Sequence, residues 1–308
     1  MLERAISSIR RSSVEPIRIL VVVNGSRNDV DLCSWLKEQP DVVFEYQHTP
    51  SAPQAVYRGR ELVETEFFST LDDDDEYLDG ATDQKLLFLR SNLATDLVVT
   101  NGYRLVGEVD KPHYSNLLRV ARDPLGVLMQ FNWLHSGNAL YRTTSVELFH
   151  FSDSHPYAEW TWLAFKLAMA SKKIGTLESM TFKCYDTPLS LSKTAAYSSS
   201  YLALFERMLG MAPEVRIAKG IKKKISAYWH HASVNALDKR HWWQSLRCHL
   251  RSVFQVGGSR YLSYSRHLLI PRRTSANAPN WLPHGYPKEV AAVTSRRLLD
   301  GSASENIA

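Results

Sequence analysis

The chain has 308 residues, of which 44% are hydrophobic, and a formal net charge of +5 at pH 7. This length and apolar content allow a substantial core, so we expect an ordinary globular protein with one large domain and an extension. The three cysteines are dispersed and odd in number, which argues against a metal motif and indicates free thiols in a reducing compartment. Because no apolar run reaches the roughly 20 residues that span a bilayer and the N-terminus lacks an apolar signal core, we expect a cytoplasmic protein.

The first part of the chain alternates strand and helix patterns. Residues 17–23 form a β-branched run that ends in turn formers at 24–29, and residues 30–37 carry apolar side chains at helical spacing. A strand at 42–46, a helix at 54–64 and a strand at 66–71 follow. This order predicts a sheet with parallel strands and ligands at the carboxyl ends of those strands.

An acidic block follows the third predicted strand. It consists of Asp72, Asp73, Asp74, Asp75 and Glu76. Carboxylate oxygens are hard ligands suited to Mg²⁺ or Mn²⁺, and such ions bind substrate phosphates through only one or two protein carboxylates. A solvated loop or a helix N-terminus, where the dipole favours negative charge, would have the same composition, so both interpretations stay open here.

Together these segments resemble the family 2 glycosyltransferases of the GT-A fold. The resemblance covers about the first two-thirds of the chain and runs through the helix pattern at 2–9, the Val-Val-Val-Asn-Gly-Ser turn at 21–26, the helix around Arg58-Gly59, the Asp-x-Asp block, and Glu159-Trp160. It implies an α/β protein, a Rossmann-like nucleotide-diphospho-sugar transferase with a mixed, mostly parallel sheet, flanking helices and a helical C-terminal extension. We expect the catalytic domain at 1–195, a basic helical extension at 196–273 and a partly disordered tail at 274–308.

The resemblance assigns the donor site. Asn24 lies where the family has an Asp that binds the nucleotide base, and Ser26 belongs to the same turn. An Asn can donate and accept, so a base contact is retained but the nucleotide stays undetermined. Asp74 would hold the Mn²⁺ or Mg²⁺ that bridges the two phosphates, and Asp72 would contact the ribose or a metal-bound water. Asp73 is also expected at the donor, and its place and that of Asp75 are ambiguous because successive strand residues face opposite sides.

The resemblance also assigns the acceptor side. Gly137 and Asn138 correspond to a small-residue turn beneath the acceptor, and Trp160 is expected beside it. Glu159 is the predicted general base, because inverting transfer needs a carboxylate that takes the proton of the acceptor hydroxyl. Asp153 is a nearby alternative. An acid in the first turn of a helix begun near residue 156 would also be favoured by the helix dipole alone.

One departure from the family pattern concerns the start of the chain. Family members have a strand and a Pro-x-x-Asn turn before the first helix, whereas Met1 already falls within that helix. We therefore expect a central strand to be missing, with unpaired backbone groups beside the donor pocket. Either the start codon is assigned too far downstream or the chain is a degenerate relative.

Basic residues are concentrated between 216 and 273, where Asp238 is the only carboxylate. Two amphipathic helices are predicted there, one with Ala218, Ile221, Ile225 and Tyr228 and one with Trp242, Trp243, Leu246, Leu250, Val253 and Phe254 on its apolar face. Their basic faces predict peripheral contact with anionic lipid at the inner membrane face, with Trp229, Trp242 and Trp243 near the headgroups. Alternatively, the apolar faces pack on the neighbouring domain. Nucleic-acid binding is not expected, since no binding motif is recognisable.

The predicted function is therefore a metal-dependent, inverting glycosyltransferase of the hexosyltransferase type. It would move a sugar from a nucleotide-sugar donor to a saccharide or lipid-linked acceptor in the synthesis of a surface polysaccharide or glycan. The alternative from a different class is a non-catalytic GT-A-like binding or scaffold protein.

Overall fold

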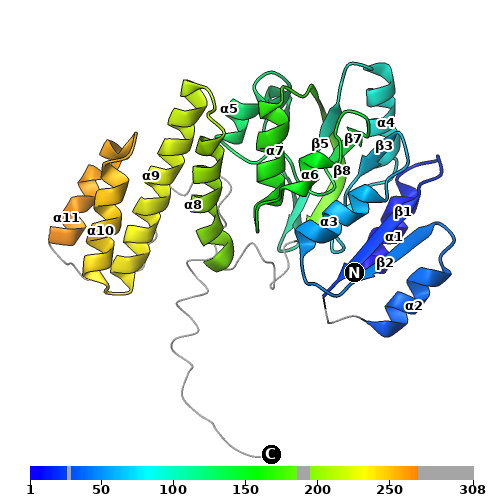
Figure 1. The fold of residues 1–308 in the computed structure, drawn as a ribbon, viewed down its shortest axis with the longest axis horizontal. Coiled ribbons are helices and arrows are strands. Elements are labelled where there is room, and N and C mark those ends of the chain that lie inside the picture. The colour runs from blue at the N-terminus through cyan, green and yellow to red at the C-terminus, as the bar shows by residue number, and fades with distance from the viewer. Residues whose placement is uncertain (26–28, 186–194, 270–308) are drawn as a thin grey trace, which may run out of the picture.

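A computed structural model describes residues 1–25, 29–185 and 195–269 (Figure 1). In its α/β part the elements are α1 Leu2–Arg11, β1 Ile19–Asn24, α2 Val30–Glu38, β2 Val42–Gln47, α3 Ala52–Glu61, β3 Phe67–Ser69, β4 Glu76–Tyr77, α4 Ala81–Ser91, β5 Leu97–Val106, β6 Val109–Pro112, η1 Leu117–Ala121, α5 Pro124–Leu128, β7 Ala139–Arg142, α6 Phe149–Ser152, α7 Glu159–Met169 and β8 Ile174–Tyr185. The helices α8 Ala195–Gly210, α9 Val215–Asp238 and α10 Trp242–Val253 follow, with η3 Gly258–Tyr264 and α11 Ser265–Leu269.

The elements up to β3 follow the order predicted from the sequence. The side chain of Asp29 accepts a hydrogen bond from the Leu32 amide (3.1 Å) and thereby caps α2. Ser51 caps α3 in the same way through the Gln54 amide (3.3 Å), and Pro53 lies in the first turn. Local capping chemistry therefore explains where both helices begin.

The strands form a two-stranded sheet, β1-β2, and a six-stranded sheet with the order β3-β7-β5-β8-β4 and β6 paired to β5. The pairs β1–β2 and β5–β8 are parallel, and the other described pairs are antiparallel. The sheet is mixed, as predicted, but it is not mostly parallel in its pairing. After β3 the strands no longer alternate regularly with crossover helices, and short connections such as the one between β5 and β6 allow antiparallel neighbours.

The two sheets are separated by a cavity of about 510 Å³ between β1 and β3. Within the described residues, neither of these strands has a hydrogen-bonded partner strand on the side that faces the other. The cavity is lined by Leu20 and Val22 of β1, by Phe67 and Phe68 at β3, and by side chains of α1, α3 and α4, among them Ile9, Val56 and Leu86. An extended segment placed there would find backbone partners on both sides.

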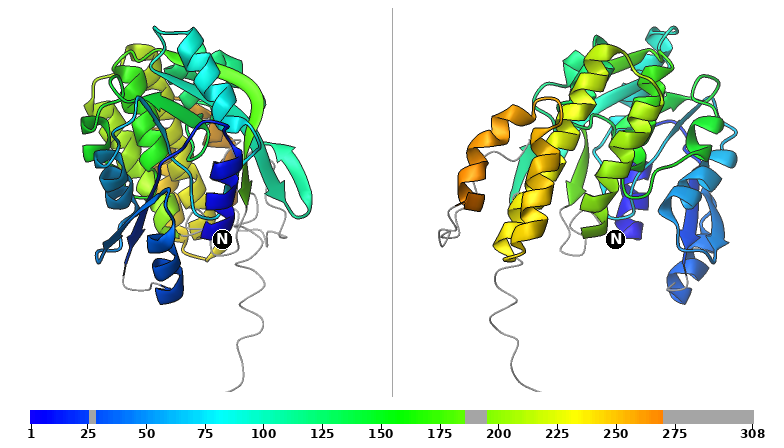
Figure 2. Two further views of the ribbon diagram at one scale, coloured as in Figure 1. Left: turned by 90° about the vertical axis from the view of Figure 1, so that its right-hand side faces the viewer. Right: turned by 60° about the vertical axis from the view of Figure 1, so that its left-hand side comes forward.

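The helices α8 and α9 share a core with the large sheet. Phe205 of α8 and Ile221 of α9 belong to the same buried cluster as Val99 and Phe182 of the sheet. Figures 1 and 2 show α8 to α11 gathered on the side of the molecule away from β1 and β2. The first two of these helices therefore cover part of the sheet, which agrees with the packing alternative for α9.

The helix α10 packs on α9 through serine hydroxyls. Ser226 and Ser252 each donate to the other's carbonyl oxygen (2.9 and 2.7 Å), and Ser233 and Ser245 do the same (2.8 and 2.7 Å). The predicted apolar face of α10 therefore points elsewhere, with Trp243 at 73% and Phe254 at 84% exposure. The serine face is buried because reciprocal hydrogen bonds satisfy each hydroxyl. Among the described helices, none is both long and apolar enough to cross a membrane.

Candidate functional site

The acidic block forms the connection between β3 and β4. Oxygens of Asp72, Asp74 and Asp75 lie within 4.8 Å of one another, whereas Asp73 is exposed and lies outside this group. The structure thus brings together the predicted pair, Asp72 and Asp74, and adds Asp75, whose side chain is buried.

Burial and neighbouring charge shift the pKa values of Asp74 and Asp75. Burial raises the pKa of Asp74, and the charges of Asp72 and Asp73 raise it further. Burial also raises the pKa of Asp75 to about 7, with Asp72 as the next contribution. Crowded carboxylates repel each other, and a divalent cation between them relieves this repulsion. The oxygen donors of Asp72 and Asp74 are the kind that Mg²⁺ and Mn²⁺ prefer, so these residues fit the predicted ion.

Arg4 of α1 holds the backbone of the acidic loop. Its guanidinium donates to the main-chain oxygen of Asp74 (2.5 Å) and pairs with Glu76 (2.9 Å). It also lies over the Tyr185 ring, 4.0 Å from the centroid, and the Tyr185 hydroxyl donates to Glu76 (2.5 Å). Arg4 therefore fixes the loop through Glu76 and the backbone.

Beneath the loop, residues 133–138 form a turn that precedes β7. Gly137 has a φ of +85°, and its amide donates to the Thr70 carbonyl (2.6 Å). A Cβ at this position would lie only 3.0 Å from the Leu71 side chain, so both the conformation and the close approach require glycine. The predicted small-residue turn thus lies against the end of β3.

The side chain of Asn138 holds the turn that is predicted to lie beneath the acceptor. Its side chain is fully buried, accepts from the His135 amide (3.0 Å) and donates to the Trp133 carbonyl (2.8 Å) and the Tyr114 hydroxyl (3.3 Å). These bonds use the polar atoms of the amide inside the turn, which leaves none of them facing a substrate.

A buried amine lies under the same turn and was not predicted from the sequence. Lys85 of α4 is 1% exposed, donates to the Gly137 carbonyl (2.9 Å) and lies 4.2 Å from the centroid of the Tyr77 ring. Burial lowers the pKa of Lys85 to about 7. No local pattern distinguishes this lysine from the exposed lysines of other helices.

Glu159 is the first residue of α7. Burial raises its pKa, and the charge of Asp72 contributes to the same shift, so the two carboxylates lie within electrostatic reach. Across residues 1–25, 29–185 and 195–269, no ion pair involves Glu159. Asp153, by contrast, pairs with Arg207 of α8. Of the two candidate bases, Glu159 is therefore the carboxylate that remains available.

Of the other predicted residues, the structure describes Trp160 and Asn24. Trp160 lines the cavity together with Asp72. Asn24 is the last residue of β1, and its side-chain oxygen accepts from the Ser51 amide (3.0 Å), so part of its hydrogen-bonding capacity holds the start of α3. Ser26 lies outside the described residues.

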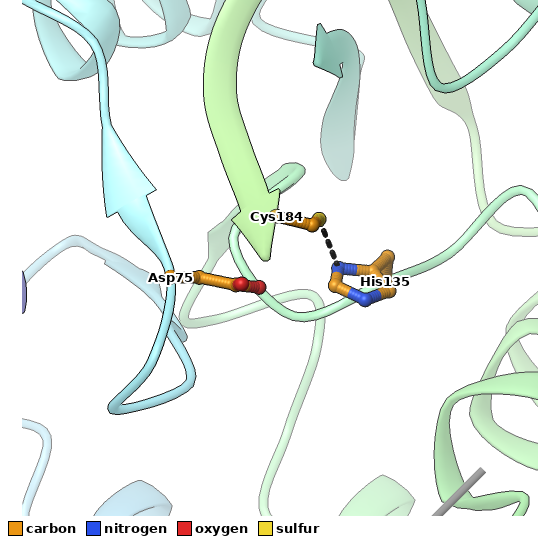
Figure 3. A group of neighbouring side chains, drawn as sticks. All are labelled: Asp75, His135 and Cys184. Carbon is orange, nitrogen blue, oxygen red and sulfur yellow. Dashed lines mark hydrogen bonds between the residues drawn. The ribbon is translucent and has the colours of Figure 1, made fainter. Parts of the chain in front are cut away.

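A second group of side chains that could bind a metal ion lies next to the acidic loop. Asp75, His135 and Cys184 come from three separate segments and point toward one another (Figure 3). The sulfur of Cys184 lies 3.9 Å from Nδ1 of His135 and 3.8 Å from Nδ1 of His113. The dispersed cysteines had argued against a metal motif, and only the pairing of β4 and β5 with β8 brings these residues together.

The mixed, curled sheet with flanking helices agrees with the GT-A fold predicted from the sequence. The chain shares this fold with residues 1–349 of S. aureus TarS in complex with UDP-GlcNAc, with a TM-score of 0.56 and 10% identity over 80% of this chain and 75% of that one. A second structure of TarS 1–349 gives a TM-score of 0.55 and 11% identity, with coverage of 82% and 76%. No protein-family model and no curated protein sequence matches the chain.

We predict that Lys85→Met weakens the pH dependence of stability in the alkaline range. The pKa of Lys85 is about 7 in the folded protein, whereas its ordinary value is 10.5, so between these pH values the unfolded chain binds the extra proton. Stability therefore rises with pH across this window, by at most about 1.4 kcal/mol per pH unit from this group. Urea unfolding at several pH values between 7 and 9.5 measures the slope. The exposed Lys219→Met variant should keep the wild-type slope, and an unchanged slope in Lys85→Met would contradict the assignment.

Proposed function

We propose that the protein transfers a sugar from a nucleoside-diphosphate donor to an acceptor hydroxyl at the acidic loop. The gathering of Asp72 and Asp74 at the end of β3, with the unpaired Glu159 in electrostatic reach, is the observation that carries this proposal. The fold supports it, and the TarS structure with UDP-GlcNAc makes a UDP-sugar the first donor to test. The finer assignment is an inverting hexosyltransferase of family 2.

The donor diphosphate would lie along the acidic loop. Asp74 would hold Mn²⁺ or Mg²⁺, and Asp72 would contact the ribose or a water on the ion. Bound there, such an ion neutralises charge on the diphosphate as it becomes the leaving group. Asn24 retains its side-chain NH₂ group for the base after its oxygen has bound Ser51.

Glu159 would act as the general base. The acceptor oxygen forms a bond to the anomeric carbon, the bond from that carbon to the donor phosphate oxygen breaks, and Glu159 takes the hydroxyl proton. Its raised pKa keeps the carboxylate a stronger base than an exposed Glu. Trp160, next to it on the cavity wall, would pack against the acceptor.

A lipid-linked acceptor would suit the exposed face of α10. Trp243, Leu250 and Phe254 lie exposed at helical spacing and are interspersed with the exposed Arg247 and Arg251. An apolar face with cationic residues binds anionic bilayers in the plane of the interface. Of the three tryptophans predicted near the headgroups, Trp229 packs on the core and Trp242 donates to the Leu268 carbonyl (2.8 Å), which leaves Trp243 exposed.

Donor binding should stabilise the fold in a metal-dependent way. We expect one nucleoside diphosphate, with UDP tested first, to raise the melting temperature only when Mn²⁺ or Mg²⁺ is present. At a free nucleotide concentration of 100 times Kd, binding should add about 2.7 kcal/mol to the free energy of unfolding. Asp74→Ala should abolish this response. Asp73→Ala, which removes an exposed carboxylate outside the group, should preserve it. If no nucleotide stabilises the wild-type chain, the donor site is absent and the non-catalytic alternative is favoured.

The variant Glu159→Gln tests whether Glu159 is the general base. The amide keeps the shape of the side chain but cannot take a proton, so we expect turnover to fall by about 10²–10⁴ while the nucleotide-induced melting shift is unchanged. Nucleotide release from the donor, followed across a panel of saccharide acceptors, measures turnover. Asp153→Asn is the matched comparison, because Asp153 is engaged with Arg207. Full turnover in Glu159→Gln would exclude Glu159 as the base.

If the exposed face of α10 binds the membrane, substitutions of its apolar residues should abolish binding to anionic vesicles. The double variant Trp243→Ser, Phe254→Ser should lose binding to vesicles that contain phosphatidylglycerol, and wild-type binding should weaken with salt and be absent on phosphatidylcholine. Leu87→Ser, Leu93→Ser removes two equally exposed apolar residues on or beside α4 and serves as the control. Co-sedimentation with vesicles measures both. Equal losses in the two double variants would contradict a specific role for α10.

A further inference from the structure

Three potential metal ligands converge below the acidic loop, on the inner side of the carboxylates assigned to the donor. Asp75 is 3% exposed and follows β3, Cys184 is 7% exposed and lies near the end of β8, and His135 belongs to the turn before β7 (Figure 3). One ligand atom from each of them lies within 4.8 Å of the other two.

We propose that Asp75, His135 and Cys184 form a second metal site, which binds Zn²⁺ or a similar soft transition-metal ion. The site is distinct in its chemistry from the oxygen-only pair Asp72 and Asp74. It does not depend on the proposed transferase activity, because its ligands face the interior of the loop.

The donor set selects the metal. Thiolate and imidazole ligands favour Zn²⁺ and related ions over Mg²⁺ and Mn²⁺, which prefer oxygen. With Zn–S near 2.3 Å and Zn–N and Zn–O near 2.0–2.2 Å, tetrahedral ligands lie roughly 3.5 Å apart. The observed separation between Cys184 Sγ and His135 Nδ1 is 3.9 Å. This separation is close to the tetrahedral value, and the three ligand atoms all lie within 4.8 Å of one another.

Neighbouring groups orient these ligands. The Tyr185 amide donates to Asp75 Oδ1 (3.1 Å), and the His135 ring stacks on Phe182 with 5.9 Å between centroids. A backbone amide of this kind commonly fixes a metal-binding carboxylate. The carbonyl of Ser136 also lies beside His135 Nδ1, so the imidazole has to turn away from this carbonyl for Nδ1 to bind an ion. His113 directly follows β6, and its Nδ1 lies 3.8 Å from the Cys184 sulfur, which makes it a candidate for a fourth position.

A metal ion at this site would link separate segments of the chain. An ion held by these residues would connect the acidic loop to β8 and to the turn that precedes β7, three segments that are far apart in the sequence. Asp75 directly follows Asp74, so the ion would also fix the direction in which Asp74 points. We therefore expect the ion to stabilise the fold as well as the acidic loop.

Cobalt substitution in the full chain tests this site, because a Co²⁺–thiolate bond gives a charge-transfer band in the near ultraviolet. After removal of any affinity tag and of bound metal, we expect wild type to bind one equivalent of Co²⁺ with this band, Zn²⁺ to displace it, and Zn²⁺ to raise the melting temperature. Cys184→Ser should abolish the band, and His135→Asn should weaken Co²⁺ binding at least tenfold. Cys248→Ser removes a cysteine of the same 7% exposure and should leave the band unchanged.

Two further measurements distinguish this metal site from the proposed donor site. Asp72→Asn should retain the band, because Asp72 is not one of the proposed ligands. If a variant does not fold, the presence or absence of the Co²⁺–thiolate band in the wild-type protein tests the proposed site. Absence of the band, or its persistence in a folded Cys184→Ser variant, would overturn the proposal. Nucleotide binding with Mn²⁺, measured on the same samples, reports on the donor site independently.

Discussion

The hydrogen bond from the buried amine of Lys85 to the Gly137 carbonyl is the constraint on which the candidate site depends. The Gly137 amide in turn donates to Thr70, and the Tyr77 hydroxyl also donates to the Thr70 carbonyl (3.0 Å). The end of β3 is therefore held by hydrogen bonds between buried and half-buried polar groups. The acidic loop begins two residues later, at Asp72, so its starting position is fixed before any ligand is bound.

The cavity between β1 and β3 separates the two halves of the proposed donor site. Asn24, assigned to the base, ends β1, whereas Asp72 follows β3. No described strand connects these two edges through backbone hydrogen bonds. Their spacing is set by α3, whose Val56 packs on the core of the large sheet and whose Gly59 lies close to Val22 of β1. The packing of α3 against both sheets therefore sets the distance between these two edges, which strand pairing sets elsewhere in the fold.

Local patterns predicted much of the fold, because β1 to β3 and their helices are each defined by residues close in sequence. The acidic block was recognisable for the same reason. Lys85 and the group around Cys184 were not, since their environment arises from contacts between residues 49 or more positions apart in the sequence. The buried face of α10 was misjudged because periodicity identifies an apolar face without showing what covers it. Serine pairs, which bury the opposite face, look polar in the sequence.

The one-residue ambiguity in the acidic block has a physical resolution. Residues 72–75 form a turn in which the Asp75 amide donates to the Asp72 carbonyl (3.2 Å), so burial rather than strand alternation distinguishes Asp74 from Asp75. Asp75 is buried and accepts a hydrogen bond from the Tyr185 amide, which directs it toward Cys184 and His135. Asp74 remains partly exposed beside Asp72. A single pair of adjacent carboxylates can therefore serve a hard ion on the substrate side and a soft ion on the interior side, and occupancy of the interior site would keep Asp74 directed at the donor.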